Sequence, residues 1–407
     1  IHRPIAEVTV EGFSLPTALY IHVPFCVSRC TYCDFYSNVA SRAGTDSMER
    51  VVMRTLDRAE DLAARFGAKG FDSVYVGGGT PSCLPRPLLR RLLSGLGRIA
   101  GTPLEWTVEA NPESVDPAFL DILGETGVNR LSMGIQTLDP ALARVLGRPG
   151  TPADSLAALR LATSRHLRVS ADLIGGSSRE GSLVAEARLL VGEGIGHLSV
   201  YDLILEEGTP LEALHRRGDF ALMDEDEAAD EREALNEGLA ELGLQRYEVS
   251  NYARSGAESL HNCCYWRMGS WLGAGPGAVS CIEILPPRGL PARAGVDGAS
   301  LRIEEDRKLE GLQAAVETAV EPLDAAFESI MMASRTVLGL DRKVFASRFG
   351  YDVERLVGKT LASWGPKLLI EGSRIALAGG ALDLGSAFLR DCLEEIEETR
   401  GSFGRQA

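Results

Sequence analysis

Three cysteines lie close together near the start of the chain, in the segment Cys26-Val-Ser-Arg-Cys30-Thr-Tyr-Cys33. Thiolates are soft ligands that favour iron–sulfur clusters and zinc. With the spacing C-x3-C-x2-C on one loop, each can bind one iron of a cubane and leave the fourth iron open, whereas electron-transfer clusters use four cysteines. A structural zinc site needs a fourth ligand, which His22 could supply, so zinc is the alternative.

An open iron can chelate a ligand that carries both an amine and a carboxylate, as the methionine end of S-adenosylmethionine does. The run Gly77–Gly79 offers backbone N–H groups free of side chains, which could hold these two groups. Glu109 and Gln136 have polar side chains that suit ribose hydroxyls. Arg148 and Asp172 are ambiguous singly and gain meaning only from their positions. Each of these residues is also typical of a turn, a cap or a surface group.

The first half of the chain alternates short β-rich segments with amphipathic ones. Strands are predicted at Ala18–Val23, Ser73–Val76, Glu105–Glu109, Arg130–Met133, Val169–Ile174 and His197–Leu203. Helices are predicted between them at Met48–Arg65, Pro87–Ile99, Pro117–Gly127, Ala153–His166 and Ser182–Gly194. Such βα repeats predict parallel strands with right-handed crossovers, and six of them are too few for a full eight-unit barrel. Chemistry in these folds lies at the C-terminal ends of the strands, where the cysteines and the glycine run fall.

The second half follows a different pattern. We expect an acidic surface helix at Asp224–Leu242, a strand at Tyr247–Ser250 and a linker rich in Pro, Gly and Ala at Ile284–Asp306. From Pro322 a winged-helix layout is predicted: a helix to about Leu338, helices at Lys343–Phe349 and Val353–Ser363, a hairpin of Leu368–Ile370 with Arg374–Leu377, and a helix at Leu384–Glu397. The predicted units are a core barrel at 13–245, an extension and linker at 246–320 and a C-terminal domain at 321–400.

The composition excludes several classes of protein. A chain of 407 residues with a net charge of −15 is poorly suited to binding nucleic acid, because its negative charge repels the phosphates. No segment has the ~18–20 consecutive apolar residues of a membrane helix. The eight cysteines are too sparse for a secreted disulfide framework, so we expect a reducing, cytoplasmic location.

Several motifs together resemble the radical S-adenosylmethionine enzymes, and within them the group of oxygen-independent coproporphyrinogen III oxidase. The motifs are Tyr20-Ile-His-Val-Pro-Phe-Cys26, Gly78-Gly79-Thr80-Pro81-Ser82, Glu109-Ala-Asn-Pro, Ser132-Met-Gly-Ile-Gln136, Asp172-Leu-Ile and Tyr247-Glu-Val-Ser-Asn251-Tyr. The resemblance is strong from Leu19 to about Ser280 and looser from Ala326 to Leu393.

The resemblance implies a partial (β/α)6 radical S-adenosylmethionine barrel with a smaller C-terminal winged-helix-like α+β domain. It implies that Cys26, Cys30 and Cys33 bind a [4Fe-4S] cluster and that an electron donor of the flavodoxin or ferredoxin type reduces it. It further implies S-adenosylmethionine contacts at Tyr20, Gly78, Gly79, Thr80, Glu109, Gln136, Arg148 and Asp172.

Two features favour the heme chaperone branch of this group. The enzymes usually extend the motif to C-x3-C-x2-C-x-C, but Phe35 occupies the extra cysteine position here. The segment His261-Asn-Cys-Cys-Tyr-Trp266 is similar to the H-N-x-x-Y-W motif of that branch, which implies heme binding with His261 as an axial ligand. His261 could instead merely pin a loop to the barrel.

The leading hypothesis is therefore a heme-binding protein that delivers heme to an apo-protein. The alternative is an enzyme that decarboxylates two propionates of coproporphyrinogen III, so whether the chain is an enzyme stays open. A radical enzyme that modifies nucleic acid is the weakest hypothesis, because the acidic balance opposes it. One departure from relatives is the loop Gly175-Gly-Ser-Ser178, which replaces Tyr-Gly-Leu-Pro.

Overall fold

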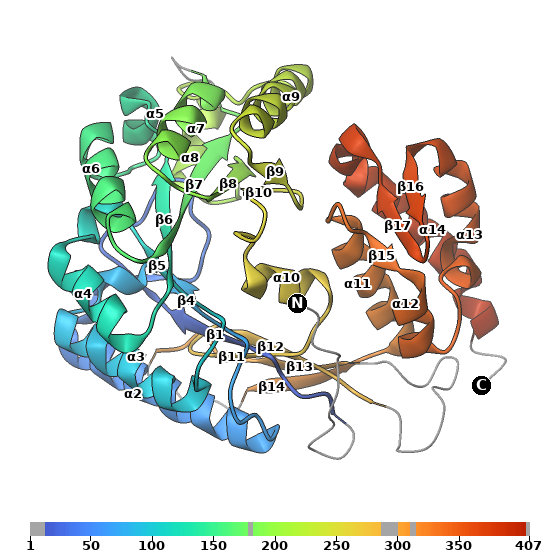
Figure 1. Cartoon of the computed structure of the whole chain (residues 1–407), viewed down its shortest axis with the longest axis horizontal. Coiled ribbons are helices and arrows are strands. Elements are labelled where there is room, and N and C mark those ends of the chain that lie inside the picture. The colour runs from blue at the N-terminus through green and yellow to red at the C-terminus, as the bar shows by residue number, and fades with distance from the viewer. Residues whose placement is uncertain (1–12, 178–181, 286–299, 310–314, 404–407) are drawn as a thin grey trace.

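The structure is a computed structural model that describes residues 13–177, 182–285, 300–309 and 315–403 (Figure 1). Its main sheet has 12 strands in the order β14-β13-β12-β11-β1-β4-β5-β6-β7-β8-β10-β9. Consecutive strands from β1 to β8 in this order are parallel. They are β1 (Ala18–Val23), β4 (Ser73–Gly78), β5 (Glu105–Ala110), β6 (Arg130–Gln136), β7 (Arg168–Gly175) and β8 (His197–Asp202). These six strands confirm the predicted βα repeats.

Helices cover the outer face of these strands, as Figure 1 shows. They are α2 (Thr45–Arg65), α3 (Arg86–Ala100), α4 (Pro117–Thr126), α6 (Pro152–Thr163) and α7 (Leu183–Gly192). Leu19 and Ile21 of β1 belong to the same buried cluster as Leu56 of α2 and Leu92 of α3. The apolar stripe of each helix therefore packs on the apolar face of the strands.

The opposite face of the strands is polar. Because side chains alternate along a strand, Tyr20 and His22 point away from the face of Leu19 and Ile21. The register places Tyr20 beside Tyr75 on β4, and Tyr75 beside Thr107 on β5. The inner face of the barrel is thus built from tyrosine, histidine and hydroxyl side chains, which makes it a site for chemistry rather than a packed core.

The strand expected at Tyr247–Ser250 is wrong. The strands in this region are β9 (Gln245–Arg246) and β10 (Asn251–Ala253), which pair antiparallel with each other, and β10 also pairs antiparallel with β8. Residues 247–250 form the connection between β9 and β10. There the backbone N–H of Ser250 donates to the carboxylate of Glu248 at 3.1 Å, and Glu248 forms only an isolated antiparallel bridge with Thr336.

The sheet continues on the other side of β1. Strand β11 (Trp271–Ala274) pairs parallel with β1, and β12 (Val279–Glu283), β13 (Ser300–Glu304) and β14 (Val316–Val320) follow antiparallel. The expected linker at Ile284–Asp306 is therefore partly wrong, because Ser300–Glu304 is a strand in which Ile303 is fully buried. Residues 286–299 of that linker lie outside the described residues.

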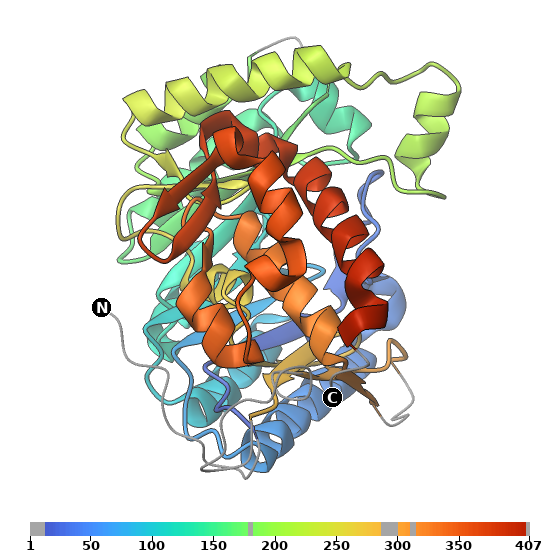
Figure 2. The ribbon, with the colours of Figure 1, turned by 90° about the vertical axis from the view of Figure 1, so that its right-hand side faces the viewer.

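The C-terminal part has the predicted order of elements. It comprises α11 (Pro322–Ser334), β15 (Leu340–Asp341), α12 (Arg342–Phe349), α13 (Glu354–Ser363), β16 (Leu368–Glu371), β17 (Arg374–Leu377) and α14 (Gly385–Phe403). Helix α11 ends before the predicted Leu338, because the residues that follow it pair with the backbone of the barrel. The N–H of Val249 donates to Arg335 C=O, and the N–H of Val337 donates to Tyr247 C=O. Figure 2 shows these helices in front of the barrel, with the long acidic helix α9 (Glu225–Glu241) above them.

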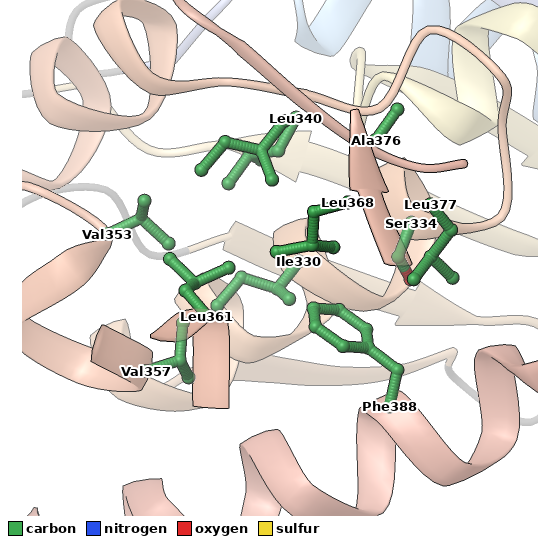
Figure 3. A pocket seen from close by; sticks show the side chains of 11 residues that line it. Ile330, Ser334, Leu340, Val353, Val357, Leu361, Leu368, Ala376, Leu377 and Phe388 are labelled. Carbon is green, nitrogen blue, oxygen red and sulfur yellow. The ribbon is translucent and has the colours of Figure 1, made fainter. Parts of the chain in front are cut away.

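This C-terminal part has a hydrophobic cluster separate from that of the barrel. Figure 3 shows Ile330, Leu361 and Phe388 around a small apolar cavity of about 20 Å³ within it. The three unit boundaries expected from the sequence remain predictions, although the two clusters agree with at least two folding units. No helix in the described ranges has the length and apolarity that crossing a membrane requires.

Candidate functional site

The cysteine loop follows β1 and is held at both ends. The two-residue strands β2 (Phe25–Cys26) and β3 (Asn38–Val39) pair with each other and close the loop. Thr31 anchors its middle, because its N–H donates to Leu146 C=O at 3.1 Å and its hydroxyl donates to Val145 C=O at 2.7 Å. The loop is therefore anchored to the barrel at its ends and at its middle.

Two polar side chains contact the thiols from neighbouring strand ends. The Thr80 hydroxyl, just after β4, lies 3.6 Å from the Cys26 sulfur. The Arg148 guanidinium lies 3.5 Å from the Cys30 sulfur, and it also donates to Asn111 Oδ1 at 3.1 Å and to Gly134 C=O at 2.6 Å. A cation beside a thiolate stabilises the negative charge that metal binding requires. Thr80 and Arg148, predicted as contacts of S-adenosylmethionine, thus lie against the cysteines themselves.

The donor set fits an iron–sulfur cluster. All eight cysteines are free, and those of the loop are only partly buried. Burial raises the pKa of the Cys26 and Cys33 thiols. Over the described ranges, no three His, Cys, Asp or Glu side chains converge on one point as ligands of a single ion would. A cubane requires only one thiolate on each of three irons, so the spacing of the loop thiols is compatible with it.

The glycine turn after β4 is needed for close packing. A Cβ on Gly79 would lie 2.5 Å from the carbonyl oxygen of Phe25, and a Cβ on Gly78, where φ is +110°, would lie 2.8 Å from the His22 ring. The N–H groups of this turn donate within the protein, and the predicted ligand contacts of Gly78 and Gly79 stay predictions. Gly79 and Thr80 donate to the carbonyls of Val23 and Phe25, and Gly78 donates to Glu109 at 3.2 Å. The turn binds β1 and β5 with its N–H groups.

Two acids predicted from the sequence face each other across the inner face of the barrel. Glu109 accepts from the Tyr75 hydroxyl at 2.7 Å. Burial, together with charge repulsion from Asp172, raises the pKa of Glu109 to about 7. Burial likewise raises the pKa of Asp172 to about 6. Two neighbouring buried carboxyl groups whose pKa values lie near neutrality favour a cationic ligand, because a bound positive charge lets both groups ionise.

Tyr201, at the end of β8, belongs to the same group and was missed in the sequence. Tyr201 is 45% exposed, yet burial of its hydroxyl raises the pKa of the phenol, and the nearby charges of Asp172 and Glu109 raise it too, while the hydrogen bond with Ser199 lowers it. The side chain therefore lines the open interior rather than the outer surface. The sequence could have indicated this position, because side chains alternate along a strand. Tyr201 follows Ser199 by two residues and therefore lies on the same, inward-facing side of the last parallel strand.

The remaining predicted contacts lie on the same side of the sheet. The Tyr20 hydroxyl is 3.0 Å from Nδ1 of His22. Gln136 ends β6 with φ of 70°, and its amide folds back over Gly134, where a Cβ would lie 2.9 Å from the amide nitrogen. In the divergent loop, Gly176 N–H donates to Glu231 at 2.9 Å, and Ser178 lies outside the described residues.

His261 borders this group, with its ring centroid 5.1 Å from that of Tyr75. It belongs to α10 (Leu260–Trp266), beside Ser73 and Glu105 at the first residues of β4 and β5, so it sits at the end of the barrel opposite the cysteines. Its side chain is 1% exposed, with Nδ1 3.0 Å from the Ser73 hydroxyl and Nε2 2.7 Å from the Tyr265 hydroxyl. Burial lowers its pKa to about 3. In this conformation both ring nitrogens are occupied, which does not fit an axial heme ligand.

Comparisons with known proteins agree with this geometry. Residues 20–180 match the model of the Radical SAM superfamily. The heme chaperone HemW of Mycobacterium tuberculosis (strain ATCC 25618 / H37Rv) is 38% identical over 274 residues, which cover 66% of this chain and 70% of that protein. HemW of Escherichia coli (strain K12) is 32% identical over 347 residues, 82% of this chain and 86% of that protein.

Among solved structures, coproporphyrinogen III oxidase (HemN) from Escherichia coli, described as a radical SAM enzyme, has a TM-score of 0.73. It is 19% identical, and the match covers 93% of this chain and 90% of that chain. At this identity the likeness establishes the fold, including the α/β barrel and the elements beyond it.

Proposed function

Because the chain belongs to the radical SAM superfamily and, within it, to the family of the heme chaperone HemW, we propose that it binds heme and delivers it to an apo-protein. Cys26, Cys30 and Cys33 would hold a [4Fe-4S] cluster, with S-adenosylmethionine beside it. The observation that carries the proposal is the loop of three free thiols held between Thr80 and Arg148 at one end of a polar barrel. A reducing compartment such as the cytoplasm belongs to the proposal, since iron binding needs free thiols.

When bound, the cluster and S-adenosylmethionine supply an electron and a bond whose cleavage gives a carbon-centred radical. Charged residues of the chain itself would stabilise the bound groups. Arg148 compensates the charge of the Cys30 thiolate, and Glu109 with Asp172 accommodates a positive ligand by releasing a proton. An external one-electron donor of the flavodoxin or ferredoxin type would reduce the site.

The cluster assignment can be tested by anaerobic reconstitution with iron and sulfide. We expect Cys26→Ser, Cys30→Ser and Cys33→Ser each to lose most of the bound iron, because every thiolate holds its own iron. Cys83→Ser is the matched control, since Cys83 is a partly buried free thiol outside the loop. Unchanged iron content in the loop variants, or a single bound zinc, would contradict the assignment.

Heme ligation by His261 can be separated from a purely structural role. Ligation would break the bond to Tyr265, so Tyr265→Phe should tighten heme binding roughly 5-fold if His261 is the ligand, since a hydrogen bond is worth about 1 kcal/mol. His261→Ala should then weaken binding. If heme titrations give one affinity for both variants and the unchanged protein, His261 only fastens α10 to the barrel.

Oxidative decarboxylation of coproporphyrinogen III is the second candidate, favoured by the fold shared with HemN. The absence of a further cysteine in the loop opposes it, because Phe35 stands there with 71% of its side chain exposed. Anaerobic incubation of the reconstituted protein with a reductant, S-adenosylmethionine and coproporphyrinogen III separates the two. Carbon dioxide and vinyl products would establish the enzyme, and stoichiometric heme capture without turnover is expected for the chaperone.

A further inference from the structure

A continuous row of rings crosses the inner face of the barrel, from the cysteine loop toward β11. We call it the aromatic chain; its members are Tyr36, His22, Tyr20, Tyr75, His261, Tyr265 and Trp271. Successive ring centroids are 6.2, 6.0, 6.3, 5.1, 4.8 and 4.6 Å apart. The members come from the loop, β1, β4, α10 and β11, and the strands β4, β1 and β11 are neighbours in the sheet (Figure 1).

Three phenols of the aromatic chain each contact a proton acceptor. Tyr20 lies 3.0 Å from His22 Nδ1, which is the free nitrogen of a neutral ring because Nε2 donates to Tyr36 C=O at 3.0 Å. Tyr75 donates to Glu109 at 2.7 Å, and Tyr265 lies 2.7 Å from His261 Nε2. A buried phenol loses an electron readily only if its proton can leave with it. These pairs supply that route.

The composition of the aromatic chain differs from that of an ordinary packed core. Packing alone would accept phenylalanine, as in the C-terminal cluster, where Phe345 packs on Phe349 and Phe388 on Trp364. Phenylalanine is not oxidised under physiological conditions. Every ring of the aromatic chain is instead an oxidisable tyrosine or tryptophan, or a histidine that can take a proton.

We propose that the aromatic chain carries oxidising equivalents out of the barrel to Trp271, where a thiol reductant in solution quenches them. Trp271 is a suitable exit because it is only partly buried and its indole N–H is fixed on Val279 C=O at 2.9 Å. Such a route would protect a protein of the radical SAM superfamily from damage when a radical forms in the barrel and no substrate is there to react with it. It goes beyond heme delivery and does not depend on it.

The balance of the process is simple. A carbon-centred radical in the barrel takes the hydrogen atom of the nearest phenol O–H and becomes a closed-shell C–H compound. That phenoxyl radical is then reduced by the next ring and regains a proton from water, to which the thiol at the exit releases one. Tyr75, Tyr265 and Trp271 in turn each give an electron inward and receive one from the next oxidisable ring, and Tyr75 and Tyr265 lend their protons to Glu109 and His261 meanwhile. The histidines are not oxidised: the electron passes His261, whose ring lies 5.1 Å from that of Tyr75 and 4.8 Å from that of Tyr265. At the exit one thiol S–H loses an electron and a proton and becomes a thiyl radical.

The test uses the full chain without a cluster, so it is independent of the cofactor assignments. Tyr75 is replaced by 3-aminotyrosine, a hole trap with a distinctive radical spectrum, and a photogenerated ruthenium(III) tris-bipyridine oxidant in solution injects holes from outside. Electron paramagnetic resonance of frozen samples measures the trapped radical. We expect Trp271→Phe to lower its yield at least threefold, and Tyr265→Phe to do the same.

Trp364→Phe is the matched control, because Trp364 lies in the C-terminal cluster away from the aromatic chain, and it should leave the yield unchanged. Circular dichroism checks that each variant folds, and Tyr265→Phe keeps the test decisive if Trp271→Phe does not fold. The proposal is overturned if the trapped radical fails to form with both Trp271 and Tyr265 present, or if its yield is insensitive to both substitutions.

Discussion

Glu109 is an acid at a position that disfavours its charge. Its pKa is raised from 4.5 to about 7, mainly by burial. Between these values the folded protein keeps a proton that the unfolded chain has released, so the free energy of unfolding falls as pH rises. The stabilising contribution of the neutral acid is complete below pH 4.5 and is lost as pH passes through 7.

Glu109→Gln should remove this pH dependence, since an amide stays neutral while still accepting from Tyr75. We expect the difference in free energy of unfolding between variant and unchanged protein to move by about 2 kcal/mol in favour of the variant from pH 5 to pH 8. Urea unfolding at both pH values measures it. Glu60→Gln on the exposed side of α2 is the control, and an equal shift there would contradict the role of burial.

Gly79 is required by sterics alone. Gly79→Ala would place a methyl 2.5 Å from the Phe25 carbonyl oxygen, so we expect a loss of about 1–3 kcal/mol in stability together with reduced iron binding. Gly124→Ala is the control: this helical glycine has nothing within 4 Å of the new Cβ, and it should gain about 0.5–1 kcal/mol. Similar stabilities of the two variants in chemical denaturation would refute the steric explanation.

At the level of elements, an ionic contact fastens the C-terminal part to the barrel. Asp383, just before α14, lies 2.8 Å from Arg246 on β9 and 3.4 Å from Arg232 on α9. The backbone pairing of 247–249 with 335–337 adjoins it. The ion pairs Arg348–Glu283 at 3.1 Å and Arg302–Glu328 at 3.0 Å also join the two parts.

Asp383→Asn should weaken this attachment by about 1 kcal/mol, because both arginines lose a partly buried partner. Hydrogen exchange should quicken at the N–H groups of Val249 and Val337. Asp324→Asn is the control, since its pair with Arg400 is exposed and lies within the C-terminal part. Exchange that is equally fast in both variants would show that Asp383 does not hold the two parts together.

The sequence predicted the six parallel strands well, because apolar and polar residues alternate along them and glycines or prolines mark their ends. It missed β13, since Ser300–Glu304 is short and follows a stretch without periodicity. Among the site residues, the spacing of the cysteines along the chain was enough to identify them. It did not predict that Thr80 and Arg148 contact their sulfur atoms. Nor could it show that His261 faces Ser73 and Tyr265, because those contacts arise from the way α10 closes one end of the barrel.

At the scale of the whole molecule, the two largest hydrophobic clusters, one in the barrel and one in the C-terminal part, predict two unfolding transitions. Phe388→Ala should enlarge the cavity of Figure 3 and cost about 3–5 kcal/mol, lowering the transition of the C-terminal part. Leu92→Ala should act in the same way on the barrel. Differential scanning calorimetry distinguishes them, and a single transition shifted equally by both would show one cooperative unit.

The place of β1 in the middle of the sheet has a consequence for synthesis. Its neighbour β11 is about 250 residues further along the chain. At a translation rate of ~5–20 residues per second, β1 emerges from the ribosome roughly 10–50 seconds before that neighbour. During this interval one edge of the first strand stays unpaired, so nascent chains would depend on protection from aggregation until β11 is made.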